Sequence, residues 1–159
     1  VTARLAEYAR RDRLDVTWVG VDPDPRALEV ARSRATEDVV FRCSDSTALV
    51  GAGEQFDIVL SNHVLHHLGE GELTRFAADS RALSRGIVLH SDIARSRLAH
   101  GLYAVGITPL APGSFLRTDG LRSIRRSYTV DELAHALPEW RVVSPSRFRV
   151  LALADGPAR

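Results

Sequence analysis

Asp22 is the residue of this chain whose position most suggests a bound ligand. It follows residues 17–21, an apolar stretch in which β-branched side chains favour a buried strand. Asp24 and Pro25 come next as the N-cap and first residue of a helix. Ligands of open α/β sheets bind beyond the carboxyl ends of the strands, where a carboxylate can accept hydrogen bonds from ribose hydroxyls. We predict a nucleoside-containing ligand at Asp22, in preference to a carboxylate that only interacts with the helix macrodipole.

Two more predicted strands end in acidic residues. Residues 39–43 lead into Asp45 and Ser46, where an Asx turn explains the carboxylate almost as well as a ligand does. Residues 86–92 end at Asp92, from which a base for a phenol or an acid would reach the crevice. We favour Asp92 over His90, because alternation along the strand turns His90 toward the helical layer.

Three histidines follow the strand predicted at residues 56–60. His63, His66 and His67 fall at helical spacing, which suggests a metal. A zinc protease would need glutamate directly after the first histidine, where this chain has valine, so we expect no metal site. His63, nearest the strand end, is the candidate for catalysis, whereas we expect His66 and His67 to be packing or surface groups.

The elements that would position these residues alternate between strand and helix. Helices are expected at 2–13, 25–35 and 71–84, between the strands at 17–21, 39–43, 56–60 and 86–92, which predicts a parallel sheet covered on both faces. Beyond it we expect a helix at 93–106 and a long loop at 107–123. Thr129 and Glu132 form a capping box for a helix that runs to about Leu137, and strands near 140–143 and 148–153 close as a hairpin around 144–146.

Composition indicates an ordinary globular chain. Its 159 residues are 45% hydrophobic and 26% charged with a formal net charge of +1, and we expect one domain over 1–159. No charge excess indicates a nucleic-acid partner, and no apolar run is long enough to span a membrane, so we expect a cytoplasmic protein. All 21 basic residues are arginines, which excludes Schiff-base lysine chemistry within this sequence.

Taken together, these motifs resemble a class I S-adenosylmethionine-dependent methyltransferase of the small-molecule type that acts on ubiquinone and menaquinone precursors. The features that carry the resemblance are the strand ending in Asp22, the Ser-Asp turn at 44–45, the closing hairpin, and above all FDIVLSNHVLHHL at 56–68. The resemblance implies a Rossmann-like α/β sandwich with a mostly parallel sheet and a C-terminal antiparallel hairpin.

The resemblance also implies roles for individual residues. Asp22 would bind the ribose hydroxyls of S-adenosylmethionine, and Asp45 would accept a hydrogen bond from the adenine amine with Ser46 beside it. Asn62 and His63 would line the floor near the sulfonium. A sulfonium is already a good leaving group, so the protein supplies positioning and, for a hydroxyl acceptor, a base, which we assign to His63 or Asp92.

Residues 93–128 are predicted to be an insertion on the substrate side. Within it, Arg125 and Arg126 would clamp an acidic or phenolic substrate, although two solvated surface arginines explain the pattern at least as well. Tyr103 would line the substrate lid, with core packing as the alternative.

The family's first strand and its glycine-rich turn do not occur in this sequence. Gly51 and Gly53 precede a strand, so they form a turn and do not replace the missing motif. We expect the strands at 17–21 and 56–60 to lack a shared neighbour, and the 159-residue chain alone to be unstable and to bind the cofactor weakly. The first residue of this sequence is valine and not methionine. We predict that the DNA upstream of the Val1 codon encodes the missing strand in frame.

The predicted function is methyl transfer from S-adenosylmethionine to a small molecule, with a hydroxyl or phenol as the preferred acceptor. Two alternatives remain open at this point. Asp22 would also suit the ribose of a nicotinamide cofactor in an oxidoreductase. The terminal hairpin and the Asn62-His63 turn favour the methyltransferase over this oxidoreductase alternative. The chain would instead be a catalytically inactive partner subunit if cofactor binding was lost together with the glycine-rich turn.

Overall fold

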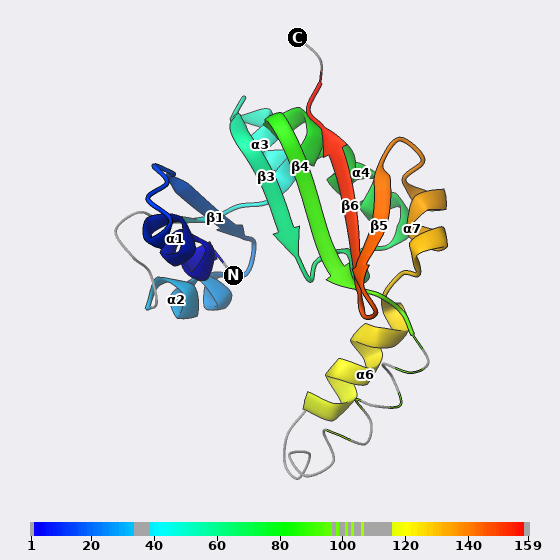
Figure 1. Ribbon diagram of the computed structural model, residues 1–159. Coiled ribbons are helices and arrows are strands. Elements are labelled where there is room, and N and C mark those ends of the chain that lie inside the picture. Colours follow the sequence, from blue (N-terminus) through cyan, green and yellow to red (C-terminus); the bar gives the residue numbers. More distant parts are fainter. Residues whose placement is uncertain are drawn as a thin grey trace. The chain divides into compact units, whose positions relative to one another are not determined.

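The computed structural model describes residues 2–33, 39–96, 98, 101, 103, 106 and 116–157. The chain divides into two compact units, Val1–Gly53 and Glu54–Arg159, and each is described by itself below. Figure 1 labels the helices and strands of both units.

Unit 1, the N-terminal unit, is a two-stranded parallel sheet with three helices. Their order is α1 (Thr2–Arg11), β1 (Trp18–Asp22), α2 (Pro25–Arg32), β2 (Val39–Cys43) and α3 (Ser46–Gly51), with Asp22 in register with Cys43. The predicted start of α2 is confirmed, because the carboxylate of Asp24 accepts from the amide of Arg26 and Pro25 is the first helical residue. A Cβ at Gly20 would lie 2.5 Å from the ring of Phe41, so the glycine lets that ring lie against β1.

Unit 2, the C-terminal unit, holds a four-stranded sheet. Its elements are β3 (Phe56–Asn62), the 3-10 turn η1 (Leu65–His67), α4 (Glu70–Leu83), β4 (Ser84–Ile93), α6 (Leu116–Arg126), α7 (Val130–Ala136), β5 (Arg141–Ser146) and β6 (Arg149–Asp155). The strand order is β3-β4-β6-β5. β3 and β4 are parallel, whereas β6 is antiparallel to both β4 and β5, which confirms the closing hairpin.

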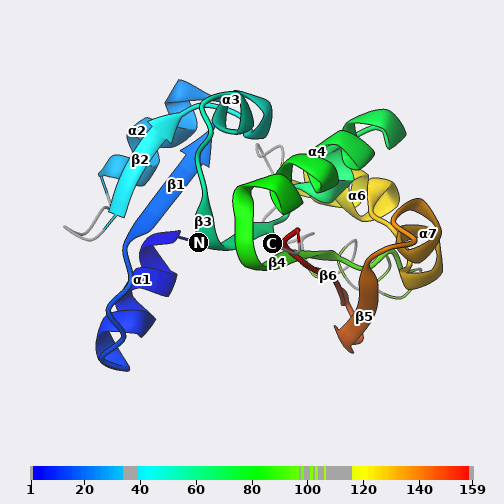
Figure 2. The ribbon, with the colours of Figure 1, turned by 90° about the horizontal axis from the view of Figure 1, so that it is seen from above.

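Helices α4 and α7 pack on one face of the unit 2 sheet (Figure 2). The side chains beneath them form the core of the unit, in which Leu65, Leu73, Val88, Leu133 and Val150 are at most 1% exposed. Alternation along β4 places Val88, His90 and Asp92 together on this helix-covered face. Both candidate bases on β4, His90 and Asp92, are therefore buried beneath the helices.

Several local expectations are wrong. β4 continues to Ile93, so no helix begins there, and residues 116–123 of the expected loop belong to α6. Residues 107–115 and most of the helix expected at 93–106 lie outside the described residues, but the described residues 98, 101, 103 and 106 are helical, as predicted. The sequence pattern did not reveal α3, which begins at an Asp45 N-cap, and β5 extends through residues 144–146, which places the hairpin turn at 147–148.

The capping box of α7 is confirmed, since the Thr129 hydroxyl accepts from the amide of Glu132 and the Glu132 carboxylate accepts from the amide of Thr129. The two sheets hold the strands that were expected to lack a common neighbour, β1 in unit 1 and β3 in unit 2. In the described part of the chain β1 pairs with β2 and β3 pairs with β4, and no strand joins β1 to β3.

Candidate functional site

Asp22 ends β1 with one carboxylate oxygen engaged and the other available. The amide of Asp24 donates to Asp22 Oδ1 over 2.8 Å, which holds the half-buried side chain at the start of α2. Within the described residues no group donates to Oδ2 of Asp22. The side chain also lines a cavity of about 270 Å³ together with Gly20, Leu28 and Phe41. This geometry leaves an acceptor at the strand end, as ribose binding requires.

Asp45 has a structural role as the N-cap of α3. Its Oδ1 accepts from the amide of Ala48 over 2.8 Å, which accounts for one of its two oxygens. The carboxylate is exposed, and Ser46 is the first residue of the helix. The bond reaches three residues along the chain, as in an N-cap, and not two residues, as in the Asx turn that the sequence suggested. The second oxygen of Asp45 has no partner in the described chain and fits a hydrogen-bond donor such as an amine.

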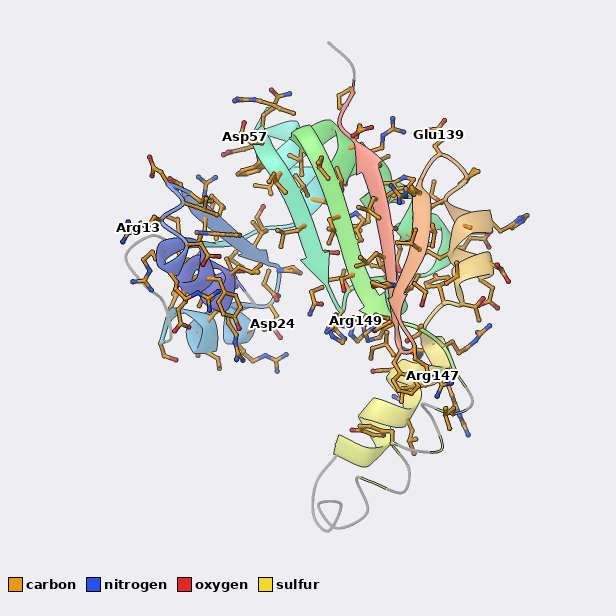
Figure 3. All side chains as sticks on the ribbon, viewed as in Figure 1. Arg13, Asp24, Asp57, Glu139, Arg147 and Arg149 are labelled. Atoms are coloured by element: carbon orange, nitrogen blue, oxygen red, sulfur yellow. The ribbon has the colours of Figure 1, made fainter. Side chains whose placement is uncertain are left out.

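At the end of β3, Asn62 is bridged to β4 by an arginine from the terminal hairpin. The guanidinium of Arg149 donates to Asn62 Oδ1 over 2.9 Å and to Ser91 Oγ over 2.8 Å. Figure 3 labels Arg149 at this end of the sheet. The antiparallel register brings it there, because Arg149 at the start of β6 pairs with Ile93 at the end of β4. Arg149 therefore fixes the amide orientation of Asn62.

His63 stands directly after β3 in a left-handed backbone conformation. Its φ is 60°, uncommon for a residue other than glycine, and its amide donates to the carbonyl of Ser91 over 2.9 Å. The ring is exposed. Partial burial lowers the pKa of His63 below its ordinary value, and nearby Arg149 acts in the same direction, while Asp92 opposes them.

Asp92 does not face solvent but is buried against η1. It is 1% exposed, and its Oδ1 lies 2.8 Å from Nδ1 of His66, which is 5% exposed. The amide of His66 donates to Oδ2 over 2.9 Å, and the amide of Ile93 donates to Oδ1 over 2.7 Å. Both oxygens of Asp92 are thus occupied, so this carboxylate would act on an acceptor only through His66.

His66 in turn lines a cavity of about 320 Å³. The other lining residues are His67, Leu68, Gly69 and Arg126, so η1 and the last turn of α6 form its walls. Arg126 is close enough to help lower the pKa of His67, after the larger effects of partial burial and of His66. The cavity combines a basic side chain, imidazoles and one leucine, which suits a polar ligand with negative charge.

His90 lies in the core and lines neither of the two cavities described above. It is fully buried, its Nδ1 lies 2.8 Å from Ser61 Oγ, and its ring is stacked on Trp140 at 5.0 Å. Burial lowers the pKa of His90 to about 4. The expectation that alternation turns His90 into the helical layer is confirmed, and the same alternation carries Asp92, two residues on, to that layer.

The predicted substrate-binding residues differ in their surroundings. Arg126 lines the cavity, whereas Arg125 is exposed and is not among its lining residues. Tyr103 packs against α6, since a Cβ at Gly120 would lie 2.2 Å from its ring. The hydroxyl of Tyr128 donates to the carbonyl of Leu68 over 3.3 Å, and partial burial raises the pKa of Tyr128. Tyr128 thereby supports one wall of the cavity.

Two residues of this site were missed by sequence reasoning. His66 was interpreted as a packing group. Two features of the sequence could have indicated its role: it lies one turn after the end of β3, and an acidic residue lies near the end of β4, the parallel neighbour of β3. Arg149 was not considered, although an antiparallel hairpin must bring the first residue of its second strand to the carboxyl end of the preceding parallel strand.

Among the residues that the structure describes, no three His, Cys, Asp or Glu side chains are placed to hold a metal ion together. Over the same residues, no helix combines the length and the apolar character that crossing a membrane would require.

The relatives found by comparison with curated proteins include two of the same name from different bacteria. The ubiquinone biosynthesis O-methyltransferase of Brucella ovis is 32% identical over 97 residues, which cover 59% of this chain and 39% of that protein. The Bartonella quintana protein of the same name is 34% identical over the same shares. The matched region thus spans well under half the length of these relatives.

The solved structures that resemble nearly the whole chain include the following two methyltransferases. Magnesium protoporphyrin IX methyltransferase from Synechocystis PCC 6803 with bound SAH has a TM-score of 0.61 at 17% identity, covering 98% of this chain and 68% of that one. The plantazolicin methyltransferase BpumL, in complex with a triazolic analogue and SAH, has a TM-score of 0.70 at 12% identity, covering 97% and 72%. These likenesses establish the fold.

The profile of the family described as "Methyltransferase domain" matches residues 2–86 of the 159. The match crosses the boundary between the two units and includes Asp22, Asp45, Asn62 and His66. The resemblance drawn from the sequence is confirmed: the chain belongs to this methyltransferase family, and its fold is the Rossmann-like fold of class I methyltransferases.

Proposed function

We propose that this chain binds S-adenosylmethionine and transfers its methyl group to a hydroxyl or phenol of a small molecule. The observation that carries the proposal is Asp22, which ends β1, lines a cavity and has one carboxylate oxygen without a partner among the described residues. A vicinal diol needs an acceptor of this kind at this place.

The residues present fit the methyl donor. Asp22 would accept from the ribose hydroxyls. Asp45, whose second oxygen has no partner among the residues that the structure describes, would accept from the adenine amine with Ser46 beside it. Asn62 is proposed to lie near the sulfonium, with its amide oriented by Arg149. S-adenosylmethionine supplies a methyl group on a sulfonium, which needs no acid to leave. The chain's own residues are left to orient the acceptor and to take its proton.

Arg126 and the imidazole rings beside it support an acceptor that carries or develops negative charge. Arg126 and His66 line the same cavity, and a phenol or an acid would match their charge and hydrogen-bonding capacity. The named activity of the ubiquinone biosynthesis O-methyltransferases agrees with a hydroxyl acceptor. We also propose that residues 93–128 form the substrate side of the site, because Arg126 and Tyr128 come from that segment.

We retain the proposal that residues 1–159 form one methyltransferase domain, because the family match runs from one unit into the other. Family membership argues against the nicotinamide-dependent alternative. An inactive partner subunit is distinguished from an enzyme by experiment.

The test is calorimetric titration of the full-length gene product with S-adenosylhomocysteine, followed by transfer of labelled methyl from S-adenosylmethionine to a panel of phenols. Binding together with labelled product supports the proposal. Binding without transfer to any acceptor would favour the inactive subunit. Absence of binding would contradict the assignment of the cofactor site.

A further inference from the structure

The most distinctive side-chain arrangement of unit 2 is the buried pair of Asp92 and His66. Its two residues come from different elements, since Asp92 lies near the end of β4 and His66 in the 3-10 turn that follows β3. Two backbone amides hold the carboxylate, with Ile93 N donating to Oδ1 and His66 N donating to Oδ2. An amide nitrogen can only donate here, so each oxygen of Asp92 serves as an acceptor.

This arrangement determines which ring nitrogen of His66 carries the hydrogen. Nδ1 lies 2.8 Å from Oδ1 of Asp92, an oxygen that already accepts from an amide. A short contact to an acceptor requires Nδ1 to be the donor, and a neutral imidazole with hydrogen on Nδ1 has its lone pair on Nε2. In the described part of the chain Nε2 of His66 has no hydrogen-bond partner.

The same ring is one of the walls of the 320 Å³ cavity that Arg126 also lines. A space of this size lies at the lower end of the range for small-molecule sites. His66 therefore has the three properties of a general base: a fixed tautomer, a carboxylate behind it that stabilises the charged ring, and access to a cavity.

We propose that His66 is the residue that removes the proton from the acceptor hydroxyl, and that Asp92 is a positioning residue that acts through it. The inference rests on the proposed methyl-transfer function and replaces His63 and Asp92 as alternative direct bases. His63 has an exposed ring to which no carboxylate of the described residues is hydrogen-bonded, and Asp92 has both oxygens occupied.

The proton and electron balance of the step is simple. The acceptor oxygen forms a bond to the methyl carbon, the carbon–sulfur bond breaks with its electron pair remaining on sulfur, and the hydroxyl proton passes to Nε2 of His66. The products are the methyl ether and the thioether S-adenosylhomocysteine, and the imidazolium beside Asp92 later returns the proton to water. No oxidant, reductant or metal enters this balance.

The sharpest variant is His66→Asn. The amide nitrogen of asparagine occupies the place of Nδ1, so the hydrogen bond to Asp92 is retained while Nε2 is removed. A packing role would tolerate this change, whereas a base would be lost. We expect turnover of a phenol with a pKa of about 10 to fall by roughly 10²–10⁴ with KM little changed. His135→Asn, at an exposed histidine of α7, is the matched control and should leave turnover unchanged.

The acceptor itself provides a second control. A phenol bearing electron-withdrawing groups is already ionised at the assay pH and has no proton to give to His66. His66→Asn should therefore slow this acceptor by less than threefold. An equal loss on ionised and un-ionised phenols would contradict the role of a base and would indicate misplacement of the acceptor.

Nitrogen NMR of the full-length protein gives a readout independent of activity. In the wild type the neutral ring of His66 should show hydrogen on Nδ1 and a bare Nε2. In Asp92→Asn the amide can donate to Nδ1, so the hydrogen should move to Nε2 and turnover should fall together with it. Hydrogen on Nε2 of His66 in the wild type would overturn the proposal.

Calorimetry separates this inference from the proposed function. Wild-type binding of S-adenosylhomocysteine with measurable methyl transfer, together with full activity of His66→Asn, would refute the base and leave the function intact. Loss of binding in the wild type would instead refute the function, and the proton-acceptor role with it. Retained binding and folding in His66→Asn, with turnover of un-ionised phenols lost, supports both.

Discussion

Acidification should destabilise unit 2 through His90, the histidine buried beneath α4. Its ring is fully buried between Trp140 and Phe76, each 5.0 Å away between ring centroids, and Nε2 has no hydrogen-bond partner among the described residues. Protonation would place a second N–H donor and a charge in this apolar space. Burial therefore lowers the pKa of His90 to about 4, compared with about 6.5 for an exposed imidazole.

The sign follows from which state binds protons more readily. Above pH 6.5 the ring is neutral in the folded and unfolded states, so His90 makes no pH-dependent contribution. As the pH falls from 6.5 toward 4, the unfolded chain takes up a proton and the folded chain does not, so stability is lost over this interval. Linkage gives a loss of about 2 kcal/mol between pH 7 and pH 5, and a total of about 3 kcal/mol at still lower pH.

The assay is urea unfolding of the full-length gene product at pH 7 and pH 5, followed by the fluorescence of Trp140. A Trp18→Phe background removes the tryptophan of unit 1, so that the signal reports the core of unit 2. The variant is His90→Phe combined with Ser61→Ala, because the serine hydroxyl would otherwise lose its partner. Its stability should change with pH by about 2 kcal/mol less than that of the wild type.

His135→Gln, at an exposed histidine, should retain the wild-type pH dependence and serves as the control. Any constant cost of the larger phenylalanine ring cancels, because only the difference between the two pH values is compared. Equal losses of stability in the wild type and in the double variant would show that His90 is already accommodated as a charged ring, and the reasoning from burial would be refuted.

Three further outcomes are expected. Asp22→Ala should weaken S-adenosylhomocysteine binding more than a hundredfold by calorimetry, because two hydrogen bonds to a charged acceptor, worth about 3 kcal/mol, are lost. Asp22→Asn should weaken binding less. An affinity of Asp22→Ala equal to that of the exposed control Asp15→Ala would remove the ribose assignment. Arg126→Gln should raise KM for a phenolic or acidic acceptor roughly tenfold with kcat little changed, whereas the control Arg75→Gln on α4 should leave KM unchanged. Equal KM values in the two variants would show that Arg126 does not contact the acceptor. Thr129→Ala should lower the urea midpoint of unit 2 through loss of about 1 kcal/mol of N-cap stabilisation, and an unchanged midpoint would mean that the Glu132 half of the capping box suffices.

Elements with a local physical signature were predicted well. The strand at 39–43 has the predicted bounds, and the starts of α2 and α7 follow from an N-cap with proline and from a capping box. The short helix α3 was missed, because six residues between an aspartate and two glycines show no periodicity that distinguishes a helix from a turn. The helix α6 was missed because Gly120 suggested a loop, whereas the glycine accommodates the ring of Tyr103.

The positions of the candidate residues at the ends of strands were predicted, whereas their contacts were not. Strand ends marked by Asp22, Asn62 and Asp92 are where the structure places carboxylates and an amide. The sequence could not show that Asp92 is occupied by two backbone amides, because these bonds depend on how the chain turns after β3. Residues two apart in a regular strand lie on the same face, so alternation places His90 and Asp92 together. The prediction that Asp92 reaches the crevice while His90 faces the helices was therefore inconsistent with a regular strand.

The backbone at His63 explains why His66, and not its neighbour, meets the carboxylate. Spacing suggested that residues 63, 66 and 67 share one face of a helix, which assumes that helical geometry begins at His63. In the structure His63 adopts a left-handed conformation with its amide bonded to Ser91, and only residues 65–67 form a 3-10 turn. The tighter turn directs the amide and the ring of His66 toward Asp92, while His67 is exposed. A left-handed residue other than glycine costs on the order of 1–3 kcal/mol and persists only where the surroundings enforce it. Here the enforcing contacts are the Ser91 carbonyl and the two hydrogen bonds between His66 and Asp92. A replacement of His63 by glycine should therefore relieve the strain and leave the His66 pair in place.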